Sequence, residues 1–197
     1  MPLSSPPVSA PHHALPTVIV LAAGRGERFT ASGGSTHKLA ALLAGKPVLQ
    51  HVLDAVQASG LRHHVVQADV SRPGMGDSIA DGVRATPDAA GWLILPGDLP
   101  LVQGASLRAV AQALMQQHAV VIPTHKGVRG HPVGFSAACR DQLLVLEGNQ
   151  GAAPVVRAYA AINSVATLEL SDVGVVTDID TLDDLARAEA LLAARQA

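Results

Sequence analysis

Short apolar runs alternate with amphipathic segments along most of the chain. The runs are rich in Val, Ile and Leu and have the length of buried strands, whereas the segments between them repeat apolar residues at helical spacing. The predicted strands cover residues 17–21, 63–67, 92–95, 119–122, 162–170 and 173–178. The predicted helices run from Pro47 to Gly60 and then cover 78–84, 105–117, two patches after residue 135, and 182–195.

This alternation of strands and helices predicts a three-layer α/β/α fold with a mostly parallel, Rossmann-like sheet. The loops after the first, third and last strands should meet at the carboxyl edge of the sheet, where ligands bind in open α/β folds. Two glycine-rich segments interrupt the pattern. Residues 23–37 are expected to form a long loop, and residues 124–135 a hairpin or a broad loop.

Composition narrows the class of protein. The 197 residues favour a single domain over residues 17–197, preceded by a disordered tail at residues 1–16, where five prolines gather. A net charge of −2 gives no basic footprint for nucleic acid, and one cysteine excludes an intrachain disulfide. No apolar run approaches the roughly 18 residues that a membrane span needs, and no signal peptide is evident. The expectation is a soluble cytoplasmic protein.

The first predicted strand ends in a glycine-rich loop, VIVLAAGRGERF at residues 18–29. Phe29 stands where a dinucleotide-binding loop would have its third glycine, and the pattern of a P-loop is absent. Glycines let backbone N–H groups approach phosphate oxygens, and Arg25, Arg28 and Lys38 add charges that suit a triphosphate. The alternative is a turn with solvated arginines.

Carboxylates follow two other predicted strands. Asp98 lies in LPGDLP, and Asp178 and Asp180 lie in VTDIDTLDDL. At the carboxyl edge Asp98 is placed to hold Mg²⁺ against phosphates, with one residue of the second pair as a further ligand. The alternatives are a turn aspartate at 98 and a helix start at 180–184, with Asp180 or Thr181 as N-cap and the next two aspartates favouring the helix dipole.

Four segments in order along the chain resemble motifs of one family. LAAG-x-G-x-R followed by a lysine resembles the triphosphate loop of nucleotidyltransferases with a mononucleotide-binding α/β fold. PGMGDSIADGV at 73–83, PTHKGVRGHPVGF at 123–135 and DIDTLDDL at 178–185 resemble further motifs of molybdenum cofactor cytidylyltransferases, within the MobA-like NTP transferase superfamily. The resemblance covers residues 17–190. Ala23 is what cytidylyl-transferring members tend to carry, where guanylyl-transferring relatives have glycine.

The resemblance implies transfer of CMP from CTP to the terminal phosphate of molybdopterin or the molybdenum cofactor, with Mg²⁺ as cofactor and release of pyrophosphate. A molybdoenzyme would receive the product. It implies catalytic roles for Arg28, Lys38 and Asp98, metal binding by Asp98 and Asp178, and acceptor binding by His131 and Asn149. It implies nucleotide binding by Leu21, Ala22, Ala23, Gly24, Arg25, Gly26, Gly74, Ser78 and Asp98.

The sequence departs from the family at two places. GNQGAA at 148–153 stands where the family has G-D-x-G-A-R, and Leu182 stands in place of a proline. The first departure leaves the acceptor open, so two alternatives remain. One is a cytidylyltransferase for a sugar- or polyol-phosphate, and the other is a nucleotide- or cofactor-binding delivery factor without catalysis. Nine histidines without ligand spacing do not predict a zinc site.

Overall fold

The computed structural model describes residues 15–24, 26–67, 69, 71, 74–116 and 118–196. Most of the tail predicted over residues 1–16 lies outside the described residues, and so does Arg25 of the glycine-rich loop. No helix in the described part of the chain has both the length and the apolar character to cross a membrane.

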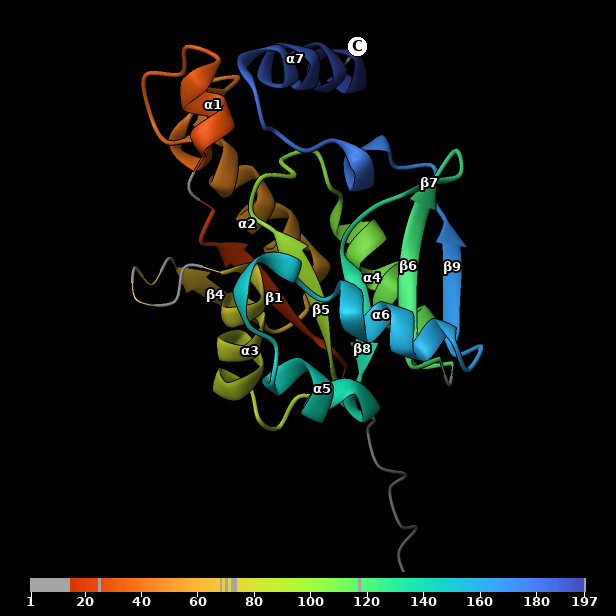
Figure 1. Cartoon of the computed structure of the whole chain (residues 1–197). Coiled ribbons are helices and arrows are strands. Elements are labelled where there is room, and N and C mark those ends of the chain that lie inside the picture. Colours follow the sequence, from red (N-terminus) through yellow and green to blue (C-terminus); the bar gives the residue numbers. More distant parts are fainter. Residues whose placement is uncertain are drawn as a thin grey trace, which may run out of the picture.

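A seven-stranded sheet forms the middle layer, in the order β4-β1-β5-β8-β6-β7, with β9 also paired to β6 (Figure 1). Its strands are β1 Thr17–Ala22, β4 His63–Gln67, β5 Gly91–Pro96, β6 Val120–His125, β7 Val128–Arg129, β8 Val133–Ser136 and β9 Val165–Glu169. The pairs β1–β4, β1–β5 and β6–β9 are parallel, whereas β8 is antiparallel to β5 and to β6. The predicted mostly parallel sheet is confirmed, with one antiparallel strand inserted in its centre.

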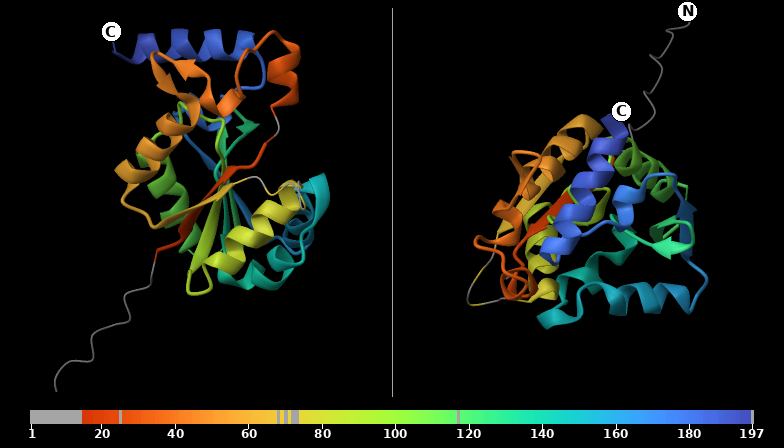
Figure 2. Two further views of the ribbon diagram at one scale, coloured as in Figure 1. Left: turned by 90° about the vertical axis from the view of Figure 1, so that its left-hand side faces the viewer. Right: turned by 90° about the horizontal axis from the view of Figure 1, so that it is seen from above.

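Helices cover both faces of this sheet (Figure 2). On one face lie α2 Val48–Ser59 and α4 Gly104–Leu114. On the other lie α3 Met75–Ala85, α5 Arg140–Leu144 and α6 Ala153–Ala160. Along β1, Val18 and Val20 pack on the first side, and Ile19 and Leu21 on the second. Because both faces are covered, the strand is apolar throughout, which is why the sequence shows runs rather than alternation.

The last helix lies at the carboxyl edge of the sheet. α7 Leu182–Gln196 lies across the top of the molecule beside α1 Glu27–Ala31 (Figure 1). A third apolar cluster, which includes Phe29, Leu43, Ile179 and Ala188, packs these elements together with the short hairpin of β2 Leu42–Leu43 and β3 Lys46–Pro47. This packing fixes the glycine-rich loop and the segment before α7 next to each other.

Two sequence predictions about local structure were wrong. Residues 23–37 are not a continuous loop, because Phe29 is buried and α1 forms around it. Residues 173–178 do not form a strand but contain the 3-10 helix η4 Val173–Val176. The buried Asp172 carboxylate accepts a hydrogen bond from Gly174 N at 2.9 Å and so caps this turn.

The predicted hairpin at residues 124–135 is present in a specific form. β6 and β7 pair across Lys126 and Gly127, whose φ angles are +51° and +78°, as a primed two-residue turn requires. The chain then returns into the sheet as β8 after the cis bond His131–Pro132. The amino end of β8 therefore lies at the edge where the parallel strands have their carboxyl ends.

The helix that follows the loop around residue 74 begins earlier than predicted. α3 starts at Met75 with Gly74 at its N-cap position, where no side chain caps the helix. Ser78 lies inside the first turn, where its hydroxyl donates to Gly74 O at 3.1 Å.

Candidate active site

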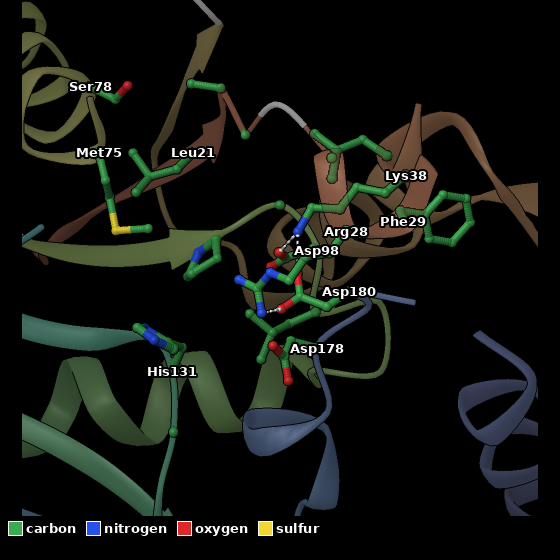
Figure 3. A pocket seen from close by; sticks show the side chains of 18 of the residues that line it. Leu21, Arg28, Phe29, Lys38, Met75, Ser78, Asp98, His131, Asp178 and Asp180 are labelled. Atoms are coloured by element: carbon green, nitrogen blue, oxygen red, sulfur yellow. Dashed lines mark hydrogen bonds and ion pairs between the residues drawn. The ribbon is translucent and has the colours of Figure 1, made fainter. Parts of the chain in front are cut away.

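A cleft of about 810 Å³ opens at the carboxyl edge of the sheet. Its walls come from the loops after β1 and β5, the start of α3, the β7–β8 connection, the 3-10 helix η3 Gly148–Gln150, and the segment between η4 and α7. Figure 3 shows side chains that line it, converging from segments far apart in sequence. This is the edge at which the sequence predicted a ligand site.

The glycine-rich loop forms one wall. Gly26 has a φ of +67° and occupies the N-cap position of α1, a conformation that L side chains rarely adopt. The ring of His37 lies 2.6 Å from Gly24 O through Nε2, which ties the loop to the 3-10 helix η1 Lys38–Ala40. A side chain at Gly24 or Gly26 would contact the Lys38 side chain, so Lys38 lies along the loop.

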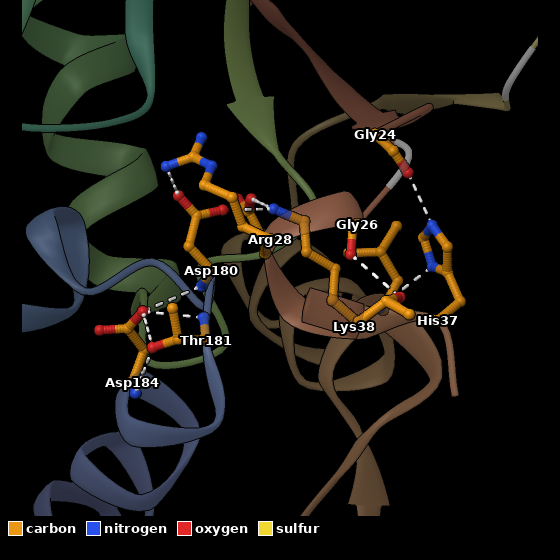
Figure 4. A network of polar contacts seen from close by, with 11 residues as sticks. Gly24, Gly26, Arg28, His37, Lys38, Asp180, Thr181 and Asp184 are labelled. Carbon is orange, nitrogen blue, oxygen red and sulfur yellow. Dashed lines mark hydrogen bonds and ion pairs between the residues drawn. The ribbon is translucent and has the colours of Figure 1, made fainter. Parts of the chain in front are cut away.

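A chain of ion pairs crosses the floor of the cleft (Figure 4). Lys38 Nζ lies 2.6 Å from Asp98 Oδ2 and 2.8 Å from Asp180 Oδ1, and Arg28 Nη1 lies 2.6 Å from Asp180 Oδ2. The Lys38 side chain is 11% exposed, whereas that of Arg28 is 79% exposed. Burial lowers the pKa of Lys38, but the Asp98 and Asp180 carboxylates outweigh it and hold the pKa above its ordinary value. Lys38 is therefore protonated and positively charged at neutral pH.

Asp180 is held by the start of α7. Thr181 N donates to Asp184 Oδ2 at 2.9 Å, and Asp184 N donates to Thr181 Oγ1 at 3.2 Å, which is a reciprocal capping box. Asp184 also accepts from Asp180 N at 3.2 Å. Burial raises the pKa of Asp184, but the hydrogen bonds from Thr181 and Asp180 outweigh it and lower the pKa. Of the two N-cap candidates, Asp180 and Thr181, it is Thr181 that caps the helix, with Asp184 as its reciprocal partner.

The segment before α7 also contacts the loop after β5. Ile179 N donates to Asp98 O at 2.9 Å, so this backbone bond brings residues 178–180 to the loop that carries Asp98. Asp178 is exposed and lines the cleft. The structure thus brings together the three carboxylates that the sequence singled out.

His131 reaches the same cleft from the opposite side, because β8 enters the sheet there. His131 N donates to Val175 O at 2.8 Å, which holds the turn against η4. The ring Nδ1 of His131 and the Oδ1 of Asp98 are both buried, and neither has a hydrogen-bond partner among the described residues. Burial lowers the pKa of His131, against the opposing pull of Asp98 and Asp178. The imidazole is therefore neutral at pH 7.

The third wall is less charged. Gly74, Met75 and Ser78 line it together with Asn149. A side chain at Gly74 would collide with the carbonyl of Gly148, so α3 and η3 can pack closely only with glycine there. This wall offers an uncharged surface beside the charged floor.

Most of the predicted site residues line the cleft: Leu21, Ala23, Gly24, Gly26, Arg28, Lys38, Gly74, Ser78, Asp98, His131, Asn149 and Asp178. Ala22 does not, because its position in β1 directs it to a separate hollow beside α2. Arg129, for which the sequence predicted no role, lines the cleft from β7. Its position two residues before His131, within the same GVRGHP segment, could have indicated that it lies at the site.

The carboxylates of this cleft fit a divalent cation that also binds phosphate. Among the described residues, no three His, Cys, Asp or Glu side chains form a cluster that could hold a metal ion by themselves. Mg²⁺ commonly takes only one or two carboxylates and completes its shell with phosphate oxygens and water. The unpartnered Asp98 Oδ1 and the exposed Asp178 offer such a pair.

Comparison with known proteins agrees with this picture. The bifunctional protein GlmU of Syntrophomonas wolfei is 28% identical over 148 residues, which are 64% of this chain and 32% of that protein. The chain thus spans about a third of the length of this curated relative. Among solved structures, Rv0371c from Mycobacterium tuberculosis is 25% identical with a TM-score of 0.68, over 89% of this chain and 98% of that one.

A nucleotidyl transferase from Methanothermobacter has a TM-score of 0.72 at 23% identity, over 89% of this chain and 96% of that one, which shows the shared fold. The model of the MobA-like NTP transferase domain matches residues 18–165, about three quarters of the chain. The match includes the glycine-rich loop, Lys38, Asp98 and His131. The chain therefore belongs to the family of MobA-like NTP transferase domains.

Proposed function

We propose that this chain is a nucleotidyltransferase that binds a nucleoside triphosphate in the cleft and transfers its nucleotidyl group to a phosphorylated acceptor, with release of pyrophosphate. The observation that carries the proposal is the ion-pair chain of Arg28, Asp180, Lys38 and Asp98 beside the glycine-rich loop. Transfer between phosphates needs alignment and charge neutralisation rather than a nucleophilic side chain.

The charge of the cleft supports a role for a divalent cation. Among the described lining residues are four carboxylates and three permanently charged cations. These residues provide no net positive charge to neutralise a triphosphate, which supports binding of the nucleotide together with a cation. Asp98 and Asp178 would hold Mg²⁺, which would supply positive charge to neutralise the phosphates.

The chain's own residues would divide the remaining work. The backbone of Gly24 and Gly26 would approach the β- and γ-phosphates, and the exposed Arg28 would hold them with its guanidinium fork. Lys38 would stabilise the α-phosphate as charge builds on it. The neutral His131, from the opposite side of the cleft, and Asn149, from the third wall, would donate hydrogen bonds to the acceptor phosphate.

We further propose CTP as the nucleotide and the terminal phosphate of a pterin, as in the molybdenum cofactor, as the acceptor. The first choice rests on Ala23 in the LAAG segment, and the second on the GHP and DIDT segments. Among proteins of the same fold are a molybdopterin-guanine dinucleotide biosynthesis protein A from Archaeoglobus fulgidus, at 18% identity, and a CMP:2-keto-3-deoxy-manno-octonic acid synthetase complexed with CTP, at 16%. Rv0371c, in turn, has been crystallised with manganese. A molybdoenzyme would then receive the product.

A second candidate acceptor is a sugar- or polyol-phosphate. The GNQGAA segment leaves it open, because Asn149 lines the cleft where the resembling family has an acidic residue. Several GlmU proteins among the curated relatives also show that the similarity is not confined to one branch of nucleotidyltransferases.

The test is pyrophosphate release with each of the four ribonucleoside triphosphates, Mg²⁺ or Mn²⁺, and a panel of pterin, sugar and polyol phosphates. CTP with the pterin phosphate should give the fastest release. Asp98→Asn should lower the rate about a hundredfold or more while the protein remains folded. The exposed Asp88 provides the control, and Asp88→Asn should leave the rate unchanged. Tight CTP binding without turnover on every acceptor would instead favour a delivery factor.

A further inference from the structure

The ammonium of Lys38 occupies the space between two carboxylates of the cleft. Its Nζ is within hydrogen-bond distance of Asp98 and of Asp180, and its side chain is 11% exposed (Figure 3). In the proposed reaction the same two groups have other tasks, because Asp98 would hold the cation and Lys38 would meet the α-phosphate. Neither group can take up that task fully while they remain paired with each other.

We propose that Lys38 is the counter-ion of Asp98 in the nucleotide-free protein, and that a triphosphate draws it away so that the divalent cation binds with the nucleotide rather than before it. This inference rests on the proposed function. In the free protein the Lys38 charge opposes a dication at Asp98, because like charges a few ångströms apart repel strongly in a partly buried site.

The surroundings of Lys38 allow such an exchange without a change of fold. The aliphatic part of its side chain lies against Gly24 and Gly26, so the ammonium is at the end of a flexible stem beside the proposed triphosphate loop. Asp180 would not be left without a partner, because its Oδ2 remains 2.6 Å from Arg28 Nη1. The capping box also holds the Asp180 backbone in place.

The first experiment measures Mn²⁺ binding to the nucleotide-free protein by paramagnetic resonance. The wild type should bind weakly, and Lys38→Gln should bind about tenfold or more tightly, because the opposing charge is gone. Arg129→Gln is the matched control. Arg129 is also a cleft cation, but the described residues give it no ion pair, so its loss should change Mn²⁺ affinity far less. Equal Mn²⁺ affinity in the two variants would overturn the proposal.

The second experiment does not depend on the stability of the Lys38 variant. CTP binding is measured by calorimetry with EDTA present, in Asp98→Asn and in Asp178→Asn. Both variants remove one negative charge from the cleft, but only Asp98 contacts Lys38. Asp98→Asn should bind CTP about tenfold more tightly than Asp178→Asn, because only there does the Lys38 ammonium lose one of its two carboxylate partners and become easier for the phosphates to draw away. No difference between the two would also refute the exchange.

The two experiments separate this inference from the proposed function. A wild-type protein that binds none of the four nucleotides with Mn²⁺ present contradicts the proposed function, while the Mn²⁺ titration still shows whether Lys38 is the counter-ion of Asp98. If the wild type binds nucleotide with Mn²⁺ but the variants match their controls, only the exchange is wrong.

Discussion

Asp172→Ala should strongly destabilise the protein, although Asp172 does not line the cleft. The Asp172 carboxylate is 6% exposed and accepts hydrogen bonds from Gln103 N at 2.9 Å, Ser106 Oγ at 2.7 Å and Gly174 N at 2.9 Å. It also pairs with Arg195 Nη2 at 2.8 Å. One side chain thus joins the start of α4, the η4 turn and the end of α7.

The expected loss follows from these contacts. Removing one partner of a buried ion pair costs about 3–5 kcal/mol, because the remaining charge and donors lose their acceptor. Asp172→Asn keeps the shape and one acceptor oxygen, so about 2 kcal/mol is expected. Arg195→Met leaves Asp172 with its neutral donors and should cost about 1–2 kcal/mol. The specific prediction is that the loss of stability is largest for Asp172→Ala, smaller for Asp172→Asn and smallest for Arg195→Met.

The assay is equilibrium unfolding in urea, followed by the fluorescence of Trp92, which is fully buried and is the only tryptophan. Asp88→Ala, at an exposed aspartate, is the control and should change the free energy of unfolding by less than about 0.5 kcal/mol. A loss below about 1 kcal/mol for Asp172→Ala would refute the reasoning, since the carboxylate would then not be the acceptor on which these elements depend.

Three further predictions concern the cleft. Because burial lowers the pKa of His131, the free energy of unfolding should be greatest above about pH 6.5 and decline below it. In urea unfolding, His131→Gln should show a smaller decline than the wild type between about pH 7.5 and 5.5, and equal declines would contradict this. Gly130→Ala should lower the free energy of unfolding by about 3 kcal/mol, because its Cβ would overlap the Val175 carbonyl. Gly127→Ala, in open space at φ +78°, should lower it by only about 1 kcal/mol, and similar unfolding midpoints in urea would argue against the clash at Gly130. Thr181→Ala should lower stability by about 1 kcal/mol through loss of the capping box, and Thr181→Ser should restore it; a stable Ala variant would show that the box contributes nothing.

The elements of the sheet were predictable because their burial leaves a direct mark on the sequence. Strands covered on both faces must be apolar throughout, and β1 and β5 match their predicted ranges closely. The edge strand β4 also lies where it was predicted, although His63 and Gln67 at its ends are exposed. The end of α2 was equally predictable, because Gly60 adopts the left-handed conformation that terminates a helix. The position of the glycine-rich loop at the carboxyl edge was also predictable, because the loop directly follows the apolar run that forms β1.

Other features depend on contacts that no local pattern encodes. η4 looked like a strand because Val173, Val175 and Val176 are β-branched, but the Asp172 cap and the close approach of Gly174 to the Leu101 carbonyl impose a 3-10 turn. The insertion of β8 between β5 and β6 could not be read from sequence either, since strand order is decided by pairing across long separations.

The sequence alone determined which chemical groups this protein brings to its cleft: a glycine-rich loop, two groups of carboxylates, a lysine and a GHP segment. Only the tertiary structure decided how they pair. Asp180 meets Lys38 across 142 positions of the chain, and the antiparallel β8 turns His131 toward Asp98. Residue types and local periodicity set the inventory, whereas ion pairing depends on distances of a few ångströms that arise only when the sheet and α7 have packed.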